Sequence, residues 1–108
     1  MEDIRPIKMI LDTDIGGDVD DAAAVAMVNI WGQMGVIEPI AIISCISSRW
    51  SAGAIDAINR YFDHPNIPVG INRRSRVLDQ ELAKTYTRYL TQHYDNRYKD
   101  MDLSLIHI

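Results

Sequence analysis

Three short apolar runs divide the chain, and they cover 7–11, 40–46 and 67–71. The first run reads Ile-Lys-Met-Ile-Leu and is nearly continuous in apolar residues. Continuous apolar runs of this length are typical of parallel strands that are buried on both faces. We therefore predict three buried strands, the second of which begins after Pro39.

Segments with helical periodicity follow each run, over 20–33, 51–62 and 79–94. Gly35 predicts the end of the first helix, and Asp79 predicts a cap at the start of the third. The residues expected to face the core are Ala23, Ala26, Met27, Ile30 and Met34 in the first helix, Ala54, Ile55, Ile58 and Phe62 in the second, and Leu82, Tyr86, Tyr89, Leu90 and His93 in the third.

The alternation of strand and helix predicts an α/β protein with an open, mostly parallel sheet made of right-handed βαβ units. The 108 residues, 47% of them hydrophobic, suffice for one small domain. In such sheets, ligands bind outside the carboxyl ends of the strands. We therefore expect a functional site in the segments that follow the three strands.

The composition limits where in the cell the protein is expected and which kinds of partner it is expected to bind. The one cysteine, Cys45, excludes an internal disulfide and fits a reducing compartment, and it is expected to be a small core residue. The chain has neither a signal peptide nor an apolar run long enough to span a bilayer, so we expect a cytoplasmic protein with no membrane partner. The net charge of −4 argues against a nucleic-acid partner, and a homo-oligomer is compatible with the sequence.

Five aspartates within ten residues lie between the first strand and the first helix. They are Asp12, Asp14, Asp18, Asp20 and Asp21, and a two-glycine turn lies among them. So many like charges repel each other unless a cation, helix N–H groups or water offset them. Carboxylates are the ligands that calcium and magnesium prefer. Simple helix capping is the alternative, although it does not account for five of them.

Two metal-dependent alternatives match part of this pattern. The aspartates follow the early spacing of an EF-hand loop, but Ala23 stands where a bidentate glutamate is required and a strand precedes the loop. A magnesium-dependent phosphatase of the haloacid-dehalogenase type also places Asp-x-Asp after a first strand, with Asp12 as nucleophile and Asp14 beside it. Gly16, however, stands where that motif usually has Thr or Val, and the later Asp pair has no role in it.

A third interpretation uses more of the residues. The segment Asp12-Thr-Asp-Ile-Gly-Gly-Asp-Val-Asp-Asp-Ala22 resembles the N-terminal signature of the inosine-uridine-preferring nucleoside hydrolases, and the segments 52–59 and 66–70 also resemble that family. The resemblance implies an open, mostly parallel α/β sheet. It also implies a calcium-dependent enzyme that hydrolyses the N-glycosidic bond of ribonucleosides to give ribose and free base.

The resemblance further implies a role for each matching residue. Asp14 would be both a calcium ligand and the general base, and Asp21 would be a second calcium ligand. Asp20 would hold a ribose hydroxyl, and Asp12 would orient the loop from behind the metal ligands. The family often has Asn after the second strand to contact the ribose, and serines stand there in this chain, so Ser48 is the candidate ribose contact.

The chain departs from the family in spacing and in length. Asp14 precedes Asp20 by six positions rather than four, which leaves Asp18 without an assigned role. The family's later calcium ligands and leaving-group residues have no counterpart here. We therefore interpret residues 1–108 as the N-terminal part of one such domain, inactive alone, and 103–108 as a non-native tail or the start of a fourth strand. A calcium-binding module without turnover is the remaining alternative.

Overall fold

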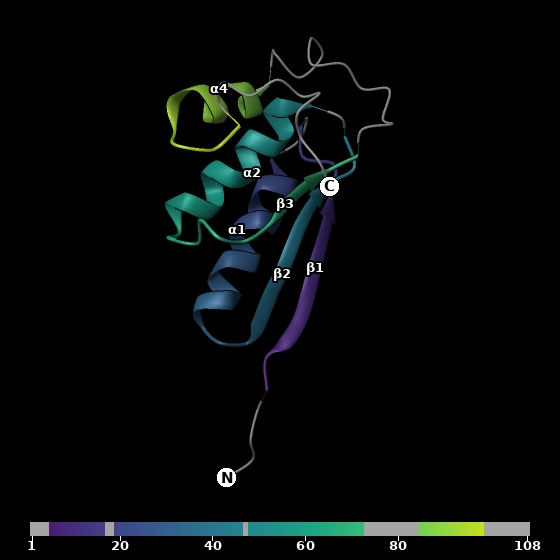
Figure 1. Cartoon of the computed structure of the whole chain (residues 1–108), viewed down its shortest axis with the longest axis vertical. Helices are drawn as coiled ribbons and strands as arrows, with labels where there is room; N and C mark the ends of the chain where they lie inside the picture. Colours follow the sequence, from purple (N-terminus) through teal and green to yellow (C-terminus); the bar gives the residue numbers. More distant parts are fainter. Residues whose placement is uncertain (1–4, 17–18, 47, 73–84, 99–108) are drawn as a thin grey trace.

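The computed structural model of the chain describes residues 5–16, 19–46, 48–72 and 85–98. These residues form a three-stranded parallel sheet and three helices (Figure 1), so the chain is a small α/β protein as the sequence predicts. The elements in chain order are β1 (Ile7–Thr13), α1 (Asp20–Gln33), β2 (Ile37–Ser44), α2 (Arg49–Tyr61), β3 (Val69–Ile71) and α4 (Tyr86–His93). No helix within the described ranges is long and apolar enough to cross a membrane.

The strands lie in the order β1-β2-β3, and both neighbouring pairs are parallel. Strand β2 begins at Ile37, three residues earlier than predicted, and therefore contains Pro39. The register between β1 and β2 shifts between Met9 and Ile10, which is a bulge beside the proline. Strand β3 pairs only with 42–44 of β2, so Pro39 lies where β2 has one partner strand and the missing N–H is tolerated.

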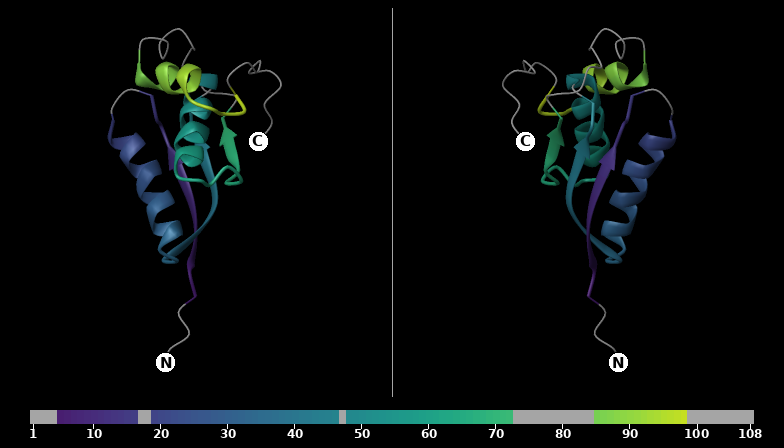
Figure 2. Two further views of the ribbon diagram at one scale, coloured as in Figure 1. Left: turned by 90° about the vertical axis from the view of Figure 1, so that its left-hand side faces the viewer. Right: turned by 90° about the vertical axis from the view of Figure 1, so that its right-hand side faces the viewer.

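Helices α1 and α2 lie side by side against one face of the sheet (Figures 1 and 2). Met9 and Leu11 of β1 pack against the core on that face. Ile10, which alternates with them, is 59% exposed, because none of the described helices covers the other face. The prediction that the first strand is buried on both faces is therefore wrong for this structure.

The predicted core face of α1 is also wrong. The structure buries Val25, Val28 and Asn29, whereas Ala23 is exposed and Met27, Ile30 and Met34 are 45%, 41% and 67% exposed. Because this helix is apolar or small at almost every position, its periodicity does not single out one face. Packing against α2 and the sheet decides which residues are buried.

The end of α1 follows the prediction from Gly35. This residue has φ +76°, and its N–H donates to the Gly32 carbonyl at 3.1 Å. The N–H of Val36 donates to the Trp31 carbonyl at 3.1 Å. These two bonds form a Schellman motif, in which glycine adopts the left-handed conformation without a steric penalty.

Helix α2 ends in the same way on a residue that is not glycine. Asp63 has φ +63°, and its N–H donates to the Arg60 carbonyl at 3.0 Å. The next N–H, from His64, donates to the Asn59 carbonyl at 2.8 Å. Aspartate and asparagine tolerate this conformation better than other residues with a Cβ atom.

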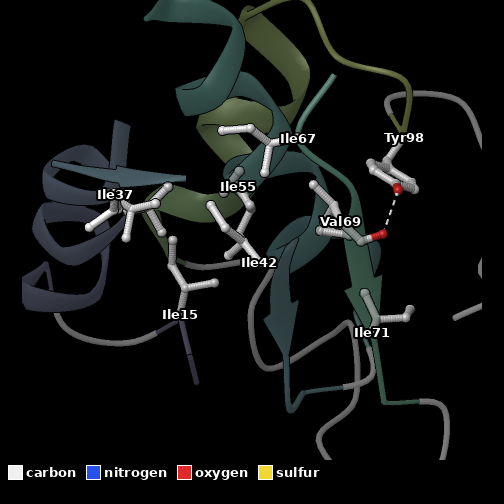
Figure 3. Close-up of a cluster of buried hydrophobic side chains, with 12 residues drawn as sticks. Ile15, Ile37, Ile42, Ile55, Ile67, Val69, Ile71 and Tyr98 are labelled. Carbon is white, nitrogen blue, oxygen red and sulfur yellow. Dashed lines mark hydrogen bonds between the residues drawn. The ribbon is translucent and has the colours of Figure 1, made fainter. Parts of the chain in front are cut away.

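The hydrophobic core lies between the sheet and the two helices α1 and α2 (Figure 3). Ala54 and Ile55 are fully buried as predicted, and Ile58 packs against the core from the edge. Tyr98 closes the side next to β3, where its hydroxyl donates to the Val69 carbonyl at 3.1 Å. Burial raises the pKa of this phenol, so it stays neutral and keeps donating.

Helix α4 packs on the first half of α2, and its predicted inward stripe is only partly right. Tyr86 and Leu90 do pack against the core. Tyr89 and His93 instead face solvent and stack on each other, with ring centroids 4.0 Å apart. The fully buried positions are threonines, and Leu82 and the predicted cap at Asp79 lie outside the described residues.

The contact between α2 and α4 depends on Gly53. A Cβ atom at this position would lie 2.9 Å from the Thr91 Cβ atom, and closer still to the Thr91 Oγ1 and Cγ2 atoms. The Thr91 hydroxyl donates to the Trp50 carbonyl at 3.1 Å. The two helices therefore approach each other as closely as a glycine permits.

Replacing Gly53 with alanine is expected to lower the free energy of unfolding by about 1–3 kcal/mol, because the added methyl group pushes α4 away. Alanine has the higher helix propensity, so packing must cause any loss. Urea denaturation measures the change. Combining this substitution with Thr91→Gly should recover part of it, whereas equal stability of wild type and Gly53→Ala would contradict the close contact.

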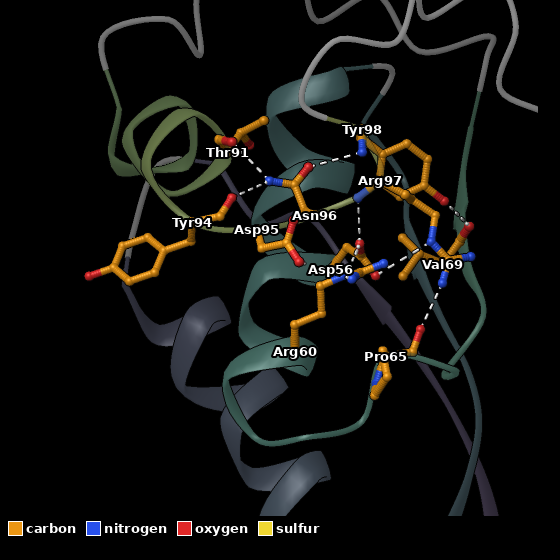
Figure 4. Close-up of polar contacts among 10 residues, drawn as sticks. All are labelled: Asp56, Arg60, Pro65, Val69, Thr91, Tyr94, Asp95, Asn96, Arg97 and Tyr98. Carbon is orange, nitrogen blue, oxygen red and sulfur yellow. Dashed lines mark hydrogen bonds and ion pairs between the residues drawn. The ribbon is translucent and has the colours of Figure 1, made fainter.

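A buried aspartate ties the segment after α4 to α2 (Figure 4). The Asp56 side chain is fully buried, and its Oδ2 atom accepts hydrogen bonds from Arg60 Nε at 3.0 Å and from the Arg97 backbone N–H at 2.9 Å. The Arg97 Nε atom lies 3.8 Å from the Asp56 Oδ1 atom. Asp95 adds a solvent-exposed contact to Arg60 Nη1 at 3.3 Å. One buried carboxylate thus holds together residues that are 41 positions apart.

Candidate functional site

The carboxyl ends of the three strands meet at one edge of the sheet (Figure 1). There the N–H of Cys45 donates to the Thr13 carbonyl, and the N–H of Asn72 donates to the Ser44 carbonyl, both at 2.9 Å. The acidic segment leaves β1 at this edge and returns as the first turn of α1. The structure therefore places Asp12, Asp14, Asp20 and Asp21 where ligands bind in open parallel sheets.

Asp14 and Asp20 lie close enough to Asp21 to affect its carboxyl group. The Asp20 Oδ1 atom accepts a hydrogen bond from the Asp21 N–H at 3.0 Å. The pKa of Asp21 lies above its ordinary value, first because the carboxyl is partly buried, and also because of the neighbouring Asp14 and Asp20 carboxylates. A bound cation would offset the repulsion that Asp14 and Asp20 exert on Asp21.

Thr13 holds the Asp21 carboxylate in place, a role that the sequence did not predict. It is buried, and its hydroxyl donates to the Asp21 Oδ1 atom at 2.9 Å, which counteracts part of the rise in the pKa of Asp21. The alternation of β1 could have predicted that Thr13 points inward, because residues 9, 11 and 13 share the face that α1 covers. A hydroxyl at this position reaches the first turn of the helix.

Asp12 and Cys45 lie at the same edge of the sheet. Asp12 is exposed near the end of β1, and Cys45, predicted to be a core residue, is exposed as well. Strand β2 ends at Ser44 rather than at residue 46, which moves the cysteine out of the strand. The pKa of its thiol is raised by partial burial and by Asp12, Asp14 and Asp21, so the thiol lies within the electrostatic field of the cluster.

Ser48, the candidate ribose contact, is fully buried at the start of α2. Its hydroxyl oxygen accepts a hydrogen bond from the Trp50 N–H at 3.1 Å and so caps the helix. This cap occupies the Ser48 oxygen in the structure. The ribose role of Ser48 stays a prediction. Asp18 and Ser47 lie outside the described residues.

The donor set suits a hard cation but does not complete a site. Asp14 and Asp21 offer carboxylate oxygens next to each other, as calcium requires. Among the described residues, however, no three His, Cys, Asp or Glu side chains are placed to hold one metal ion. Calcium takes about six to eight oxygen ligands, so these two carboxylates form only part of a coordination shell.

No family model matches the chain, and comparisons with curated proteins and with solved structures likewise gave no match. The likeness to nucleoside hydrolases therefore depends on the motif residues alone.

Proposed function

We propose that the chain is the N-terminal part of a calcium-dependent nucleoside hydrolase, which cleaves the N-glycosidic bond of a ribonucleoside to give ribose and free base. The observation that carries the proposal is that Asp14 and Asp20 lie beside Asp21 at the carboxyl edge of the sheet, where burial and then these neighbours raise the pKa of Asp21. The order of the motif residues along the chain resembles that of the nucleoside hydrolases, and this resemblance is the reason for proposing N-glycosidic hydrolysis as the reaction.

The proposed roles follow from the chemistry of each group. Bound calcium would supply positive charge that makes a neighbouring water more acidic. Asp14 takes a proton from the attacking water while the water oxygen bonds to the anomeric carbon. The carbon–nitrogen bond breaks, and its electron pair leaves with the base. Asp20 accepts a hydrogen bond from a ribose hydroxyl, and the carboxylates stabilise the positive charge that develops on the sugar.

The hydrolase proposal is preferred to the phosphatase because of Asp21. The Asp-x-Asp phosphatase motif gives this residue no role, yet Thr13 holds its carboxylate by a 2.9 Å hydrogen bond. A buried threonine that positions the second predicted calcium ligand is more consistent with a metal site that includes α1.

Calcium is expected to bind the chain weakly and to depend on Asp14 and Asp21, because two carboxylates replace only part of the hydration shell. Isothermal titration of calcium into wild type, Asp14→Asn and Asp21→Asn tests this, and both variants should lose the binding. Asp63→Asn is the matched control, since it removes one negative charge elsewhere and asparagine tolerates φ +63°. Equal affinity in all four proteins would contradict the assignment.

The pH dependence of calcium binding should follow Asp21. Because its pKa is raised in the folded chain, calcium must displace a proton from it as the pH falls, and affinity should decrease on acidification. In the absence of calcium, the free energy of unfolding is expected to depend on pH in the opposite direction. The folded chain holds the Asp21 proton more tightly than the unfolded chain does. Its stability should therefore fall as the pH rises from the ordinary pKa of an aspartate through the raised pKa of Asp21. Thermal melts with and without calcium, at neutral and mildly acidic pH, measure both effects.

A further inference from the structure

Helix α1 lies at one side of the molecule and presents an apolar face to solvent (Figure 2). Its exposed residues Ala23, Met27, Ile30 and Met34, here called the outer stripe, follow one another at intervals of four, three and four positions. This is the spacing with which one helix packs along another. The sequence predicts a buried position for each of them, yet the structure exposes all four. A periodic apolar face that is exposed indicates a surface for binding another protein.

The charge pattern of α1 favours an identical partner. Residues 22–37 carry no charged side chain, whereas the chain as a whole has a net charge of −4. Two copies with this net charge repel each other, and the outer stripe lets them meet without opposing like charges. Asp20 and Asp21 precede the stripe at one end. An antiparallel arrangement therefore keeps the two acidic ends apart, whereas a parallel arrangement places them together.

A cavity adjoins the small end of the outer stripe. Its volume is about 400 Å³, and Ala22, Ala23 and Ala26 of α1 line it together with residues of the neighbouring helices that include Tyr61 and Tyr94. Both tyrosines are exposed, at 77% and 47%. An apolar cavity of about 150 Å³ already holds a benzene molecule, so this one has room for a side chain of a partner.

Antiparallel pairing brings the large end of one stripe to the small end of the other. When a twofold axis lies midway between Met27 and Ile30, these two residues face each other across the pair, and Met34 of one copy faces Ala23 of the other. The methionine then lies beside the cavity, and its flexible, unbranched side chain suits an irregular gap. A protrusion and a hollow in matching positions make this face self-complementary, as a twofold interface requires.

The exposed area is sufficient for a dimer. The outer stripe, Trp31 and the two cavity tyrosines together expose an area on the order of the 800 Å² that each partner contributes to a standard interface. We propose that this face binds a second copy of the chain in an antiparallel, twofold-symmetric dimer, in which Met34 of each copy enters the cavity of the other. The dimer requires neither calcium nor hydrolysis, so it goes beyond the proposed function and is tested separately from it.

Sedimentation equilibrium of the purified chain measures the dimer. The mean mass of wild type should rise with concentration toward twice that of the monomer. Met34→Glu is expected to weaken the dimer by about tenfold or more, because it places an unpaired charge in an apolar cavity. Tyr89→Glu is the matched control, since it adds the same charge at an exposed residue of α4 that is not among those lining the cavity. Thermal melts confirm that both variants are folded.

Cysteine cross-linking tests the direction of the helices. Cys45 is the one cysteine of the chain, so Cys45→Ser gives a background without thiols. Ala23→Cys and Met34→Cys are made separately in this background, mixed, and treated with a mild oxidant. The antiparallel dimer predicts disulfides between the two variants and few within either of them.

The outcomes are distinct. A wild type that stays monomeric overturns the proposal, and uptake of an apolar dye by that monomer would assign the cavity to a small molecule instead. Equal dimerisation of Met34→Glu and Tyr89→Glu also overturns it, because the interface then lies outside the outer stripe. Disulfides within each cysteine variant, but not between the two, indicate a parallel dimer and overturn the antiparallel arrangement. Because calcium is left out throughout, failure of the dimer differs from failure of the calcium site.

Discussion

Replacing Asp14 with asparagine is expected to abolish the release of free base from inosine or uridine. The assay uses the longest protein that contains these 108 residues, with calcium present, and measures ribose and free base. Asparagine keeps the size of the side chain but cannot accept the proton of the attacking water, and loss of a general base lowers rates by about 10²–10⁴-fold. We therefore expect a loss of at least about a hundredfold in kcat.

Two controls make this result specific. Asp63→Asn changes a carboxylate outside the cluster and should leave the rate unchanged. Asp12→Asn separates the hydrolase from the phosphatase, because Asp12 would be the nucleophile only in the latter. Magnesium-dependent cleavage of phosphate monoesters that fails in Asp12→Asn, without release of base from nucleosides, would replace our proposal with the phosphatase.

Replacing Asp56 with alanine is expected to lower the free energy of unfolding by about 3 kcal/mol. This lies at the low end for breaking a buried ion pair, because Arg60 and Arg97 are partly exposed and water can solvate their released charges. The substitution also leaves the Arg97 backbone N–H without its acceptor at 2.9 Å. Denaturant unfolding, followed by circular dichroism, gives the change.

Asp95 provides the matched comparison for Asp56. Both carboxylates contact Arg60, but the side chain of Asp95 is 90% exposed, whereas that of Asp56 is fully buried. Asp95→Ala should change stability by no more than about 1 kcal/mol, as is usual for surface ion pairs. Similar losses in the two variants would show that burial of Asp56 does not determine its contribution.

The local signals in the sequence were sufficient for the order and type of the elements. Glycine at position 35 ends α1 because a left-handed residue is needed there, and this is a property of the residue itself. The apolar runs predict the three strands because a parallel strand needs apolar residues wherever it is covered. Their exact ends and register were less predictable, since the bulge between Met9 and Ile10 arises from pairing between strands.

The buried faces of the helices were harder to predict, for different reasons in α1 and α4. Helix α1 has apolar side chains on nearly all sides, so either Val25 or Met27 was compatible with its pattern, and contact with α2 selects Val25. In α4 the large residues seemed the natural core, but Thr87 and Thr91 are the buried residues, and Thr91 is the one that meets Gly53. Steric fit between two helices cannot be seen in the periodicity of one.

The candidate site shows the same division. The sequence by itself determined that the aspartates follow a strand and open a helix, because strand and helix signals flank them directly. Only the tertiary structure decided that Asp21 is the partner of the Thr13 hydroxyl, that Cys45 is exposed beside the cluster, and that Arg49 and Arg88 each lie over the Trp50 ring. Each of these depends on side chains that are brought together by packing across the sheet or between helices. Residues distant in the sequence carry no local signal of such a meeting.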